Sequence, residues 1–197
     1  MTPLDLATKP TLTGDLVVLR PFREGDLDAM VEILSDPDVR ALTGSVETTA
    51  EAHQRQELDD RLRDWYATRN DQPDRLDLAI EDRATSRLVG EVVLNEVDTG
   101  ARTANLRVLV GPDGRGKGIG TEAVGITTAY GLERLGLRRI TLEVFDHNPR
   151  GRRVYEKVGY AATGQRADAL HFDGIAIGAT DMAVDAGSWR GWPPRDA

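Results

Sequence analysis

Two side chains in the C-terminal part of the sequence have the types and the spacing for acid–base chemistry: Glu143 in RITLEVF and Tyr155 in YEKVGY. Alternation along RITLEVF places Glu143 on one strand face among apolar neighbours, and burial there would raise its pKa toward that of a general base. A carboxylate at a sheet edge, paired with an arginine, is the other interpretation. Tyr155 is either a core aromatic with its hydroxyl at the rim or a neutral phenol, of pKa about 10, that protonates a leaving group such as a thiolate.

A glycine-rich stretch, GRGKGIGTEAV, leads from Gly114 into a helical pattern. Glycines at 114, 116, 118 and 120 leave main-chain N–H groups uncovered at the positive end of a helix, where an anion such as phosphate is favoured. Arg115 and Lys117 would add mobile positive charge. A flexible surface turn is the alternative. The sequence does not match the P-loop motif, because Gly120 is followed by Thr121 and Glu122 in place of Lys and Ser or Thr. It does not match the dinucleotide-binding motif either, because Thr121 stands where GxGxxG needs its last glycine.

Strands and helices must position these residues, and the hydrophobic pattern predicts their order. A strand, a long helix and another strand around the glycine loop predict a right-handed crossover between two parallel strands. Gly125 and Gly131 interrupt that helix, and close packing on the sheet would explain them. The predicted strands cover residues 16–19, 76–81, 88–97, 104–110 and 139–145, the second to fourth as an antiparallel meander. The predicted helices are one capped by Asp26, one over 48–68, one from the loop to Leu135 and one over 149–158; residues 160–184 are predicted to form a closing hairpin.

Length and composition limit the classes of protein to consider. The 197 residues, 40% of them hydrophobic, predict a single domain over 1–197, with a core at about 12–184 and a tail at 185–197 that packs on the domain or on a second subunit. A net charge of -8 disfavours nucleic acid and anionic membranes as partners. The absence of cysteine excludes disulfides and thiol nucleophiles, and His53, His147 and His171 lack metal-ligand spacing, so no metal is expected. Neither an export signal nor a membrane-spanning run is present, which predicts a cytoplasmic protein.

A further pattern around the loop is RxxGxG, formed by Arg115, Gly118 and Gly120 between a strand and a long helix. With it, and with GDLVVLRPFREGDLDAM, LVGEVVL and LEVFDHNPRGRRVYEKVGY, the sequence resembles the GNAT superfamily of acetyl-CoA-dependent N-acetyltransferases. It is similar in particular to the RimJ, RimL and RimI group, which acetylates protein N-termini, and to the small-molecule-modifying relatives of that group. The resemblance implies a mixed α/β fold: a mostly antiparallel sheet of six or seven strands, a parallel pair splayed at the cofactor site, and about four flanking helices.

The resemblance also implies a cofactor site for acetyl-CoA. The main-chain N–H groups of the loop would hold the coenzyme A diphosphate, and a main-chain N–H on the preceding strand would bind the thioester oxygen. An asparagine at the start of the next helix touches the cofactor in many family members, although Asn148 followed by Pro149 is also an ordinary helix start. Arg150, Arg152 and Arg153 either reach the phosphates or solvate their helix. The implied cofactor-binding residues are Leu109, Val110, Arg115, Gly116, Lys117, Gly118, Ile119, Gly120, Thr121 and Asn148.

Catalytic roles follow from the same resemblance. RimI-like enzymes use a strand glutamate and a helix tyrosine spaced as Glu143 and Tyr155 are, which implies a base and an acid for direct attack of a primary amine on acetyl-CoA in a ternary complex. Glu91 or a water chain is the alternative base. The acceptor is expected to be a small-molecule amine or a protein N-terminus, bound between residues 24–69 and the C-terminal hairpin, and a homodimer is plausible for the family. The competing hypotheses are a coenzyme-A-binding regulatory module without chemistry and a tRNA-acetylating toxin, which the net acidity disfavours.

Overall fold

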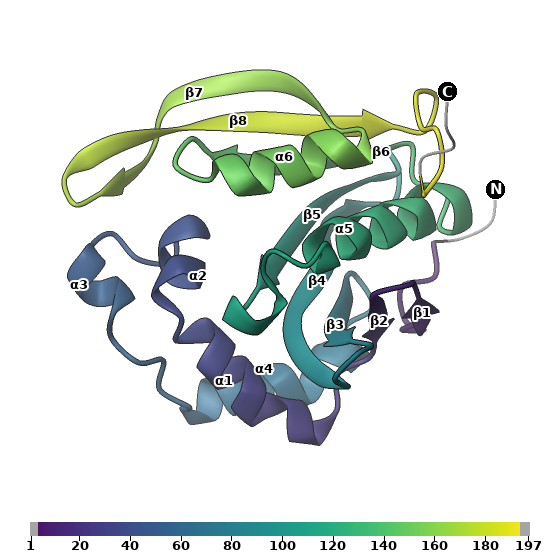
Figure 1. The fold of residues 1–197 in the computed structure, drawn as a ribbon. Helices are drawn as coiled ribbons and strands as arrows, with labels where there is room; N and C mark the ends of the chain where they lie inside the picture. The colour runs from purple at the N-terminus through teal and green to yellow at the C-terminus, as the bar shows by residue number, and fades with distance from the viewer. Residues whose placement is uncertain (1–3, 194–197) are drawn as a thin grey trace.

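The computed structural model describes residues 4–193 and arranges them around one eight-stranded sheet (Figure 1). The strand order is β1-β2-β3-β4-β5-β6-β8-β7. The fold class predicted from the sequence is confirmed, and the strand that the sequence pattern did not predict is β1, which is too short to carry a pattern. The bounds are β1 Leu12–Thr13, β2 Val17–Arg20, β3 Leu76–Asp82, β4 Arg87–Asp98, β5 Thr103–Val110, β6 Arg139–Phe145, β7 Ala161–Phe172 and β8 Ile175–Asp185.

The pairing of these strands follows the predicted topology. Strands β2 to β5 form the antiparallel meander, and β5 and β6 are parallel, as a crossover through a helix requires. The closing hairpin is also confirmed, with β8 antiparallel to both β6 and β7. Its tip reaches the α2–α3 region (Figure 1), where the Asp173 N–H donates to the Glu47 carbonyl at 2.8 Å.

The parallel pair diverges after a short contact. Residues 103–105 of β5 pair with residues 139–141 of β6, but β5 continues to Val110 and β6 to Phe145 without further pairing between them. This is the splay that the family resemblance implied. Main-chain polar groups of both strands are therefore left without a ladder partner where the strands separate.

Helices cover both faces of the sheet. On one face α5 (Ile119–Ala129), a π-helical turn (Tyr130–Arg134) and α6 (Pro149–Val158) pack through residues such as Val124 and Tyr155 onto the larger hydrophobic cluster. On the other face lie α1 (Leu27–Leu34), α2 (Pro37–Leu42), α3 (Thr49–Ala52) and α4 (Asp60–Thr68), of which α1, α2 and α4 share a second cluster around Met30, Val39 and Tyr66. There are more helices than the four expected.

One additional helix, α2, begins at Pro37, where no helix was predicted, and the other arises in the region predicted as one helix over residues 48–68. Thr48 caps α3, and Asp59 caps α4 by accepting from the Leu62 N–H at 2.8 Å, so two short helices flank an irregular segment. Asp26 is the N-cap residue of α1, as predicted, but its side chain makes no capping hydrogen bond. Its carboxylate instead accepts from the Arg20 guanidinium at 2.7 and 2.9 Å and from the Arg23 N–H, and the Arg20 contact helps to hold the pKa of Asp26 below its ordinary value.

The two glycines expected to interrupt the long helix, Gly125 in α5 and Gly131 in the π-helical turn, have different neighbours. A Cβ on Gly131 would meet Ile140, Leu137 and Leu94, so close packing on the sheet accounts for this glycine as predicted. A Cβ on Gly125 would lie 2.2 Å from the Trp192 ring, which means that Gly125 faces the C-terminal tail and not the sheet. The tail therefore packs on the domain through Trp189 and Trp192 as far as it is described; residues 194–197 lie outside the described part.

Candidate active site

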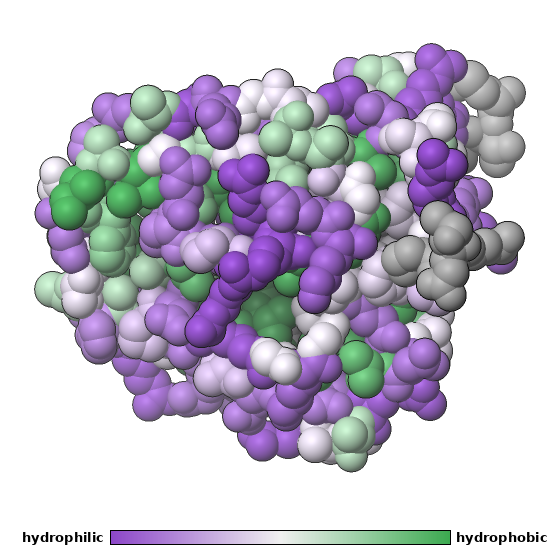
Figure 2. Space-filling view, turned by 45° about the horizontal axis from the view of Figure 1, so that its top comes forward, coloured by the Kyte–Doolittle hydropathy of each residue, from purple (hydrophilic) through white to green (hydrophobic). Residues whose placement is uncertain are grey.

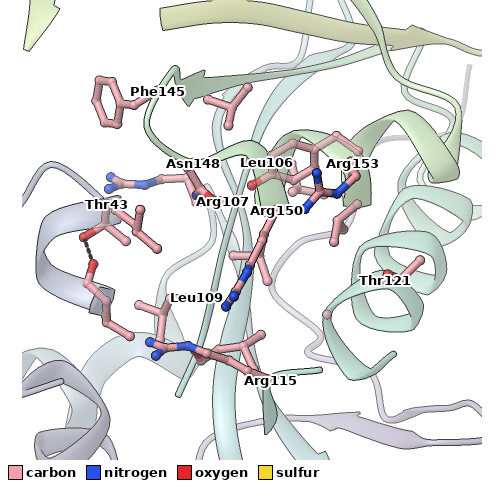
Figure 3. A pocket seen from close by; sticks show the side chains of 18 of the residues that line it. Thr43, Leu106, Arg107, Leu109, Arg115, Thr121, Phe145, Asn148, Arg150 and Arg153 are labelled. Carbon is pink, nitrogen blue, oxygen red and sulfur yellow. Dashed lines mark hydrogen bonds between the residues drawn. The ribbon is translucent and has the colours of Figure 1, made fainter. Parts of the chain in front are cut away.

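A cavity of about 1080 Å³ opens where β5 and β6 separate (Figure 3). It reaches from the glycine loop, past the diverging strands, to α6 on one side and α2 on the other. Figure 2 shows one face of the molecule as mainly hydrophilic, with a hollow whose floor is hydrophobic. The residues that line the cavity and enter the argument are Asp38 and Thr43 at α2, Glu96 on β4, Asn105 to Val110 on β5, Arg115 to Thr121 at the loop, Glu143 and Phe145 on β6, and Asn148, Arg150, Arg153, Tyr155 and Lys157 at α6.

The glycine loop presents a row of unbonded main-chain amides. Gly116 and Gly118 adopt positive φ angles of 76° and 83°, which glycine tolerates best, and Gly118 is the N-cap of α5. Within residues 4–193, none of the N–H groups of residues 116–121 has a hydrogen-bond acceptor, whereas the Glu122 N–H bonds to the Gly118 carbonyl at 3.0 Å. Free amides at the positive end of an eleven-residue helix are a fitting site for a diphosphate.

Arg115 and Lys117, the two cations of the loop, were expected to carry mobile positive charge, but both lie near carboxylates. The Arg115 guanidinium pairs with Asp36 and, at 3.1 Å, with Asp38, while its Nε donates to the Val110 carbonyl at 3.0 Å. Arg115 therefore links the start of α2 to the end of β5, because two carboxylates near the helix start hold it there. Lys117 lies 3.8 Å from the Asp82 carboxylate and is more than half exposed.

A glutamate in the first turn of α5 fixes the loop to the sheet. The Glu122 carboxylate accepts from the N–H groups of Asp15, Leu16 and Val17 at 2.9, 2.7 and 2.9 Å. These bonds satisfy the main chain of the turn before β2 and place a negative charge at the positive helix end. The orientation of the amides toward the cavity is thus set by a contact between segments far apart in the sequence.

The main chain of β5 has a free donor toward the gap. The Gly111 N–H donates to the Val89 carbonyl at 2.8 Å, so alternation along the antiparallel ladder directs the Leu109 N–H toward β4 and the Val110 N–H away from it. Because β6 has already diverged, the Val110 N–H faces the cavity. Of the two residues that the family resemblance implied as oxyanion donors, the geometry favours Val110.

Glu143 lines the cavity but is not buried, so the prediction that apolar neighbours enclose it is wrong. Its side chain is 34% exposed and pairs with Arg166 from β7, which also pairs with Asp181 at 3.2 Å. The separation of β5 from β6 leaves this sheet face open. The alternative interpretation of Glu143, a carboxylate paired with an arginine, describes its contacts better, although β6 is not an edge strand.

Tyr155 is only 7% exposed and lines the cavity from α6. Burial raises the pKa of its phenol to about 12, and the nearby Arg107 charge opposes the rise. Its ring contacts Tyr160 edge-on, with centroids 6.1 Å apart. Within residues 4–193 its hydroxyl has no hydrogen-bond partner, unlike the Tyr160 hydroxyl, which lies 3.0 Å from the Thr128 hydroxyl. An unbonded phenol at a cavity wall is available to a ligand.

The start of α6 combines a helix cap with unpaired cations. The Asn148 side chain accepts from the Gly151 N–H at 2.9 Å, which confirms the ordinary helix start. Arg150, Arg153 and Lys157 line the cavity and have no ion pair among the described residues. Arg152 points elsewhere and pairs with Glu156 at 2.9 Å. Only some of the arginines of this helix can therefore reach a bound anion (Figure 3).

The alternative base, Glu91, does not line the cavity. Its carboxylate pairs with the buried Arg69 and accepts from the Tyr66 hydroxyl at 3.2 Å. Burial has the largest effect on Tyr66 and, together with the adjacent Glu91 charge, raises the pKa of its phenol far above the ordinary value. Neither an exposed strand position nor a cleft carboxylate describes Glu91, because the Arg69 contact directs it into the packing between α4 and the sheet.

Sequence reasoning missed Arg107 and Glu96, both of which line the cavity. A charged residue between the apolar Leu106 and Val108 was the available signal for Arg107. Glu96 had no such signal, because its position depends on a β-bulge. In the described part of the chain, no cluster of His, Cys, Asp and Glu could hold a metal ion, and no helix is long and apolar enough to cross a bilayer.

Comparison with known families gives one broad match. Residues 17–161 match the family model described as an acetyltransferase (GNAT) domain. The spermidine N(1)-acetyltransferase of Vibrio cholerae is 28% identical over 95 residues, which are 48% of this chain and 54% of that protein. The uncharacterized N-acetyltransferase YoaA of Bacillus subtilis is 24% identical over 165 residues, or 84% of this chain and 90% of its own length. The alignment to the first of these relatives thus spans about half of its length.

Among solved structures, spermidine N-acetyltransferase from Vibrio cholerae in complex with CoA and spermine superimposes with a TM-score of 0.76. The match covers 89% of this chain and 98% of that one at 21% sequence identity. At this identity the likeness establishes the fold.

Proposed function

The chain belongs to the GNAT acetyltransferase family, and from this premise we propose that it is an N-acetyltransferase that moves the acetyl group of acetyl-CoA to a primary amine by direct attack in a ternary complex. The observation that carries the proposal is the row of unbonded amides at residues 116–121, at one end of a cavity that also contains the unbonded Tyr155 hydroxyl. These two features support a diphosphate site and a proton donor in one cavity. A regulatory module that only binds coenzyme A would not need a proton donor.

The loop and α6 supply the binding site for the cofactor. The amides of residues 116–121 bind the diphosphate, and Arg150, Arg153 and Lys157 add unpaired positive charge along one side of α6. Asn148 keeps the start of this helix in place beside the cavity. Bound acetyl-CoA supplies an activated thioester.

The Val110 N–H and Tyr155 then act at the reacting atoms. A hydrogen bond from the Val110 N–H stabilises the negative charge that develops on the thioester carbonyl oxygen. Because this N–H belongs to a fixed strand, the donor does not have to reorganise during the reaction. Tyr155 donates its phenolic proton to the departing sulfur. A phenol of pKa about 12 is a weak acid beside a thiol of pKa about 8.5 in water, but desolvation in the same cavity raises the pKa of the thiol as well.

Glu143 is the carboxylate that can accept the proton of the attacking amine, directly or through water. It lines the cavity, whereas Glu91 is held by Arg69 away from it. The ion pair with Arg166 stabilises the charged form of Glu143 and so weakens it as a base. A water chain is the alternative route for this proton.

The acceptor is a primary amine bound on the side of α2 and the β7–β8 hairpin. Similarity to a spermidine acetyltransferase supports a small-molecule acceptor, and the resemblance to the RimJ and RimL group supports a protein N-terminus. We also propose that residues 1–197 form a single acetyltransferase domain. A homodimer, which the family resemblance makes plausible, is part of the same proposal.

The experiment is turnover of acetyl-CoA by the purified protein, followed by detection of free thiol, across peptides, polyamines and other primary amines. Tyr155→Phe should lower kcat about 100-fold or more, the usual size of a general-acid effect, with little change in the Kd of acetyl-CoA. An equal loss of affinity and turnover would instead make Tyr155 structural. Tight acetyl-CoA binding without thiol release for any acceptor would support the regulatory module.

A further inference from the structure

Arg107 lies in the middle of β5, on the acceptor side of the sheet. It is opposite Val93 in the β4–β5 ladder and shares its strand face with Leu109, which packs against the α1, α2 and α4 cluster. Leu106, on the other face, belongs to the core beneath α5. The Arg107 side chain therefore projects on the side opposite α5 and α6, into the cavity that it lines (Figure 3).

The charges around this part of the cavity are mostly neutralised within the protein, and Arg107 is an exception. Asp38 pairs with Arg115, and Glu143 pairs with Arg166. Arg107 is exposed and has neither an ion pair nor a side-chain hydrogen bond within residues 4–193. A cation that lines a cavity without an internal partner is a candidate ligand for an anionic group.

One carboxylate of the same cavity, Glu96, also has no ion pair among the described residues. It occupies a bulge in β4, at the register shift between Asn95 and Asp98, and has a φ angle of 50°. A non-glycine residue in this region is strained, and such strain concentrates at functional sites. The acceptor half of the cavity thus presents one unpaired charge of each sign.

We infer that the amine acceptor of this enzyme also carries a carboxylate, which Arg107 binds, while Glu96 attracts the ammonium group before it is deprotonated. The inference rests on the proposed acetyltransferase function. A molecule with both groups, such as an amino acid or a peptide, matches the pair of unpaired charges. A polyamine would bring several positive charges next to Arg107, which is unfavourable.

The cofactor phosphates have a separate set of cations. Arg150, Arg153 and Lys157 come from α6, and the loop amides lie at the N-terminus of α5. Arg107 belongs to the opposite sheet face. Its loss should therefore change acceptor selection and leave acetyl-CoA binding unchanged.

The test uses ω-amino carboxylates, α,ω-diamines and n-alkylamines of equal chain length, together with short peptides, as acceptors in the free-thiol assay. The ratio of kcat/KM between two acceptors cancels any general effect of a substitution on the chemical step. In the wild type we expect the amino carboxylate to exceed the matched diamine and alkylamine. Arg107→Met should lower the ratio of the amino carboxylate's kcat/KM to that of the alkylamine by about 10- to 100-fold, as loss of a hydrogen bond to a charged group does, and the ratio cancels the effect of the lost charge on Tyr155.

Arg107→Glu should reverse the order, so that the diamine exceeds the amino carboxylate. Arg152→Met is the matched control, because Arg152 is a partly exposed arginine that points away from the cavity. Equal turnover of all three acceptor types, or ratios unchanged by Arg107→Met, would overturn the assignment of Arg107 and leave acetyltransferase activity standing. No turnover of any amine would refute the proposed function, and the acceptor inference with it. A weaker Kd for acetyl-CoA in Arg107→Met would reassign Arg107 to the cofactor.

Discussion

Charged groups are arranged in opposite ways in two regions of this molecule. In the Arg69 cluster (Arg69, Asp77, Glu91 and Tyr66), the guanidinium is 2% exposed, pairs with Asp77 at 2.6 Å and with Glu91, and lies 4.7 Å from the Tyr66 ring centroid. In the cavity, the open cations (Arg107, Arg150, Arg153 and Lys157) have no ion pair within residues 4–193.

The difference separates charges that hold the fold from charges that are available to a ligand. Arg69 follows α4 directly and is bound to carboxylates on β3 and β4, so its pairs attach this helix to the sheet. Burying those charges is tolerable only because they are paired. The open cations remain near solvent, where an unpaired charge costs little, and become strongly interacting only when an anion enters the cavity.

The largest effect is expected from breaking the Arg69 cluster. Arg69→Met leaves Glu91 without its cation and Asp77 with Arg75 alone, which should lower the free energy of unfolding by about 3–5 kcal/mol. Urea unfolding measures the change. Arg55→Met, which breaks an exposed pair with Glu32, is the control and should cost less than about 1 kcal/mol. Similar losses in the two variants would contradict the distinction between the regions.

A second effect concerns the pH dependence of stability. The unfolded chain releases the Tyr155 proton at about pH 10, whereas the folded protein retains it until about pH 12. The contribution of Tyr155 is therefore complete below pH 10 and is lost as the pH rises to 12, in total about 3 kcal/mol. Tyr66 and Tyr160 have raised pKa values for the same reason, burial, so the wild type loses more than this.

The comparison of wild type with Tyr155→Phe isolates the contribution of Tyr155. Urea unfolding at several pH values between about 9 and 11 should show a steeper decline for the wild type than for the variant. Parallel declines would mean that the Tyr155 hydroxyl is not desolvated in the folded state, and the argument for its place in the cavity wall would fail.

A third effect tests the loop amides without changing any charge. A Cβ on Gly120 would lie 3.5 Å from the Val110 side chain, an ordinary contact, and alanine is favoured over glycine in a helix by up to about 1 kcal/mol. Gly120→Ala should therefore keep or raise the melting temperature. The added methyl group lies among the free amides and hinders the approach of the diphosphate, so the Kd of acetyl-CoA should rise about tenfold. Calorimetry measures this Kd. Gly25→Ala, where a Cβ would meet nothing within 4 Å, is the control; unchanged affinity in Gly120→Ala would place the phosphates elsewhere.

Much of the fold could be predicted because local patterns specify it. Alternation gave the meander and β6, and Asn148-Pro149 with Gly159 gave the bounds of α6. The helix over residues 48–68 was wrong because the caps at Thr48 and Asp59 look, in the sequence, like polar residues on an exposed helix face. Local pattern fails where one polar side chain has two possible roles.

The site was predictable only where its geometry lies in the main chain. Glycine permits the positive φ angles of the loop regardless of its neighbours in space, so the roles of Gly116 and Gly118 could be predicted from the sequence. The partners of Arg115 are not, because Asp36 and Asp38 are far away in the chain and become neighbours only when α2 docks against β5. The exposure of Glu143 likewise depends on the separation of β5 from β6, which no residue of β6 encodes alone.

The smallest effect compares two adjacent arginines of α6. Arg153 lines the cavity and is followed one turn later by Lys157, so the two like charges repel each other in the free protein. Arg152 is paired with Glu156 in the same i,i+4 arrangement. Arg153→Gln should leave stability equal or slightly higher and weaken acetyl-CoA binding about three- to tenfold, with a weaker dependence on salt. Arg152→Gln should cost about 0.3–0.5 kcal/mol of stability and leave the Kd unchanged.

Loss of affinity in Arg153→Gln and loss of stability in Arg152→Gln would distinguish a charge that binds a ligand from a charge that stabilises the fold. Thermal unfolding and calorimetry at two salt concentrations measure both properties on the same preparations. If both variants lost affinity equally, α6 would attract the cofactor through its overall charge, because the long-range field does not depend on which arginine faces the cavity. If only Arg153→Gln lost affinity, a contact within the cavity would be required, because Arg152 and Arg153 differ mainly in the direction in which their side chains point.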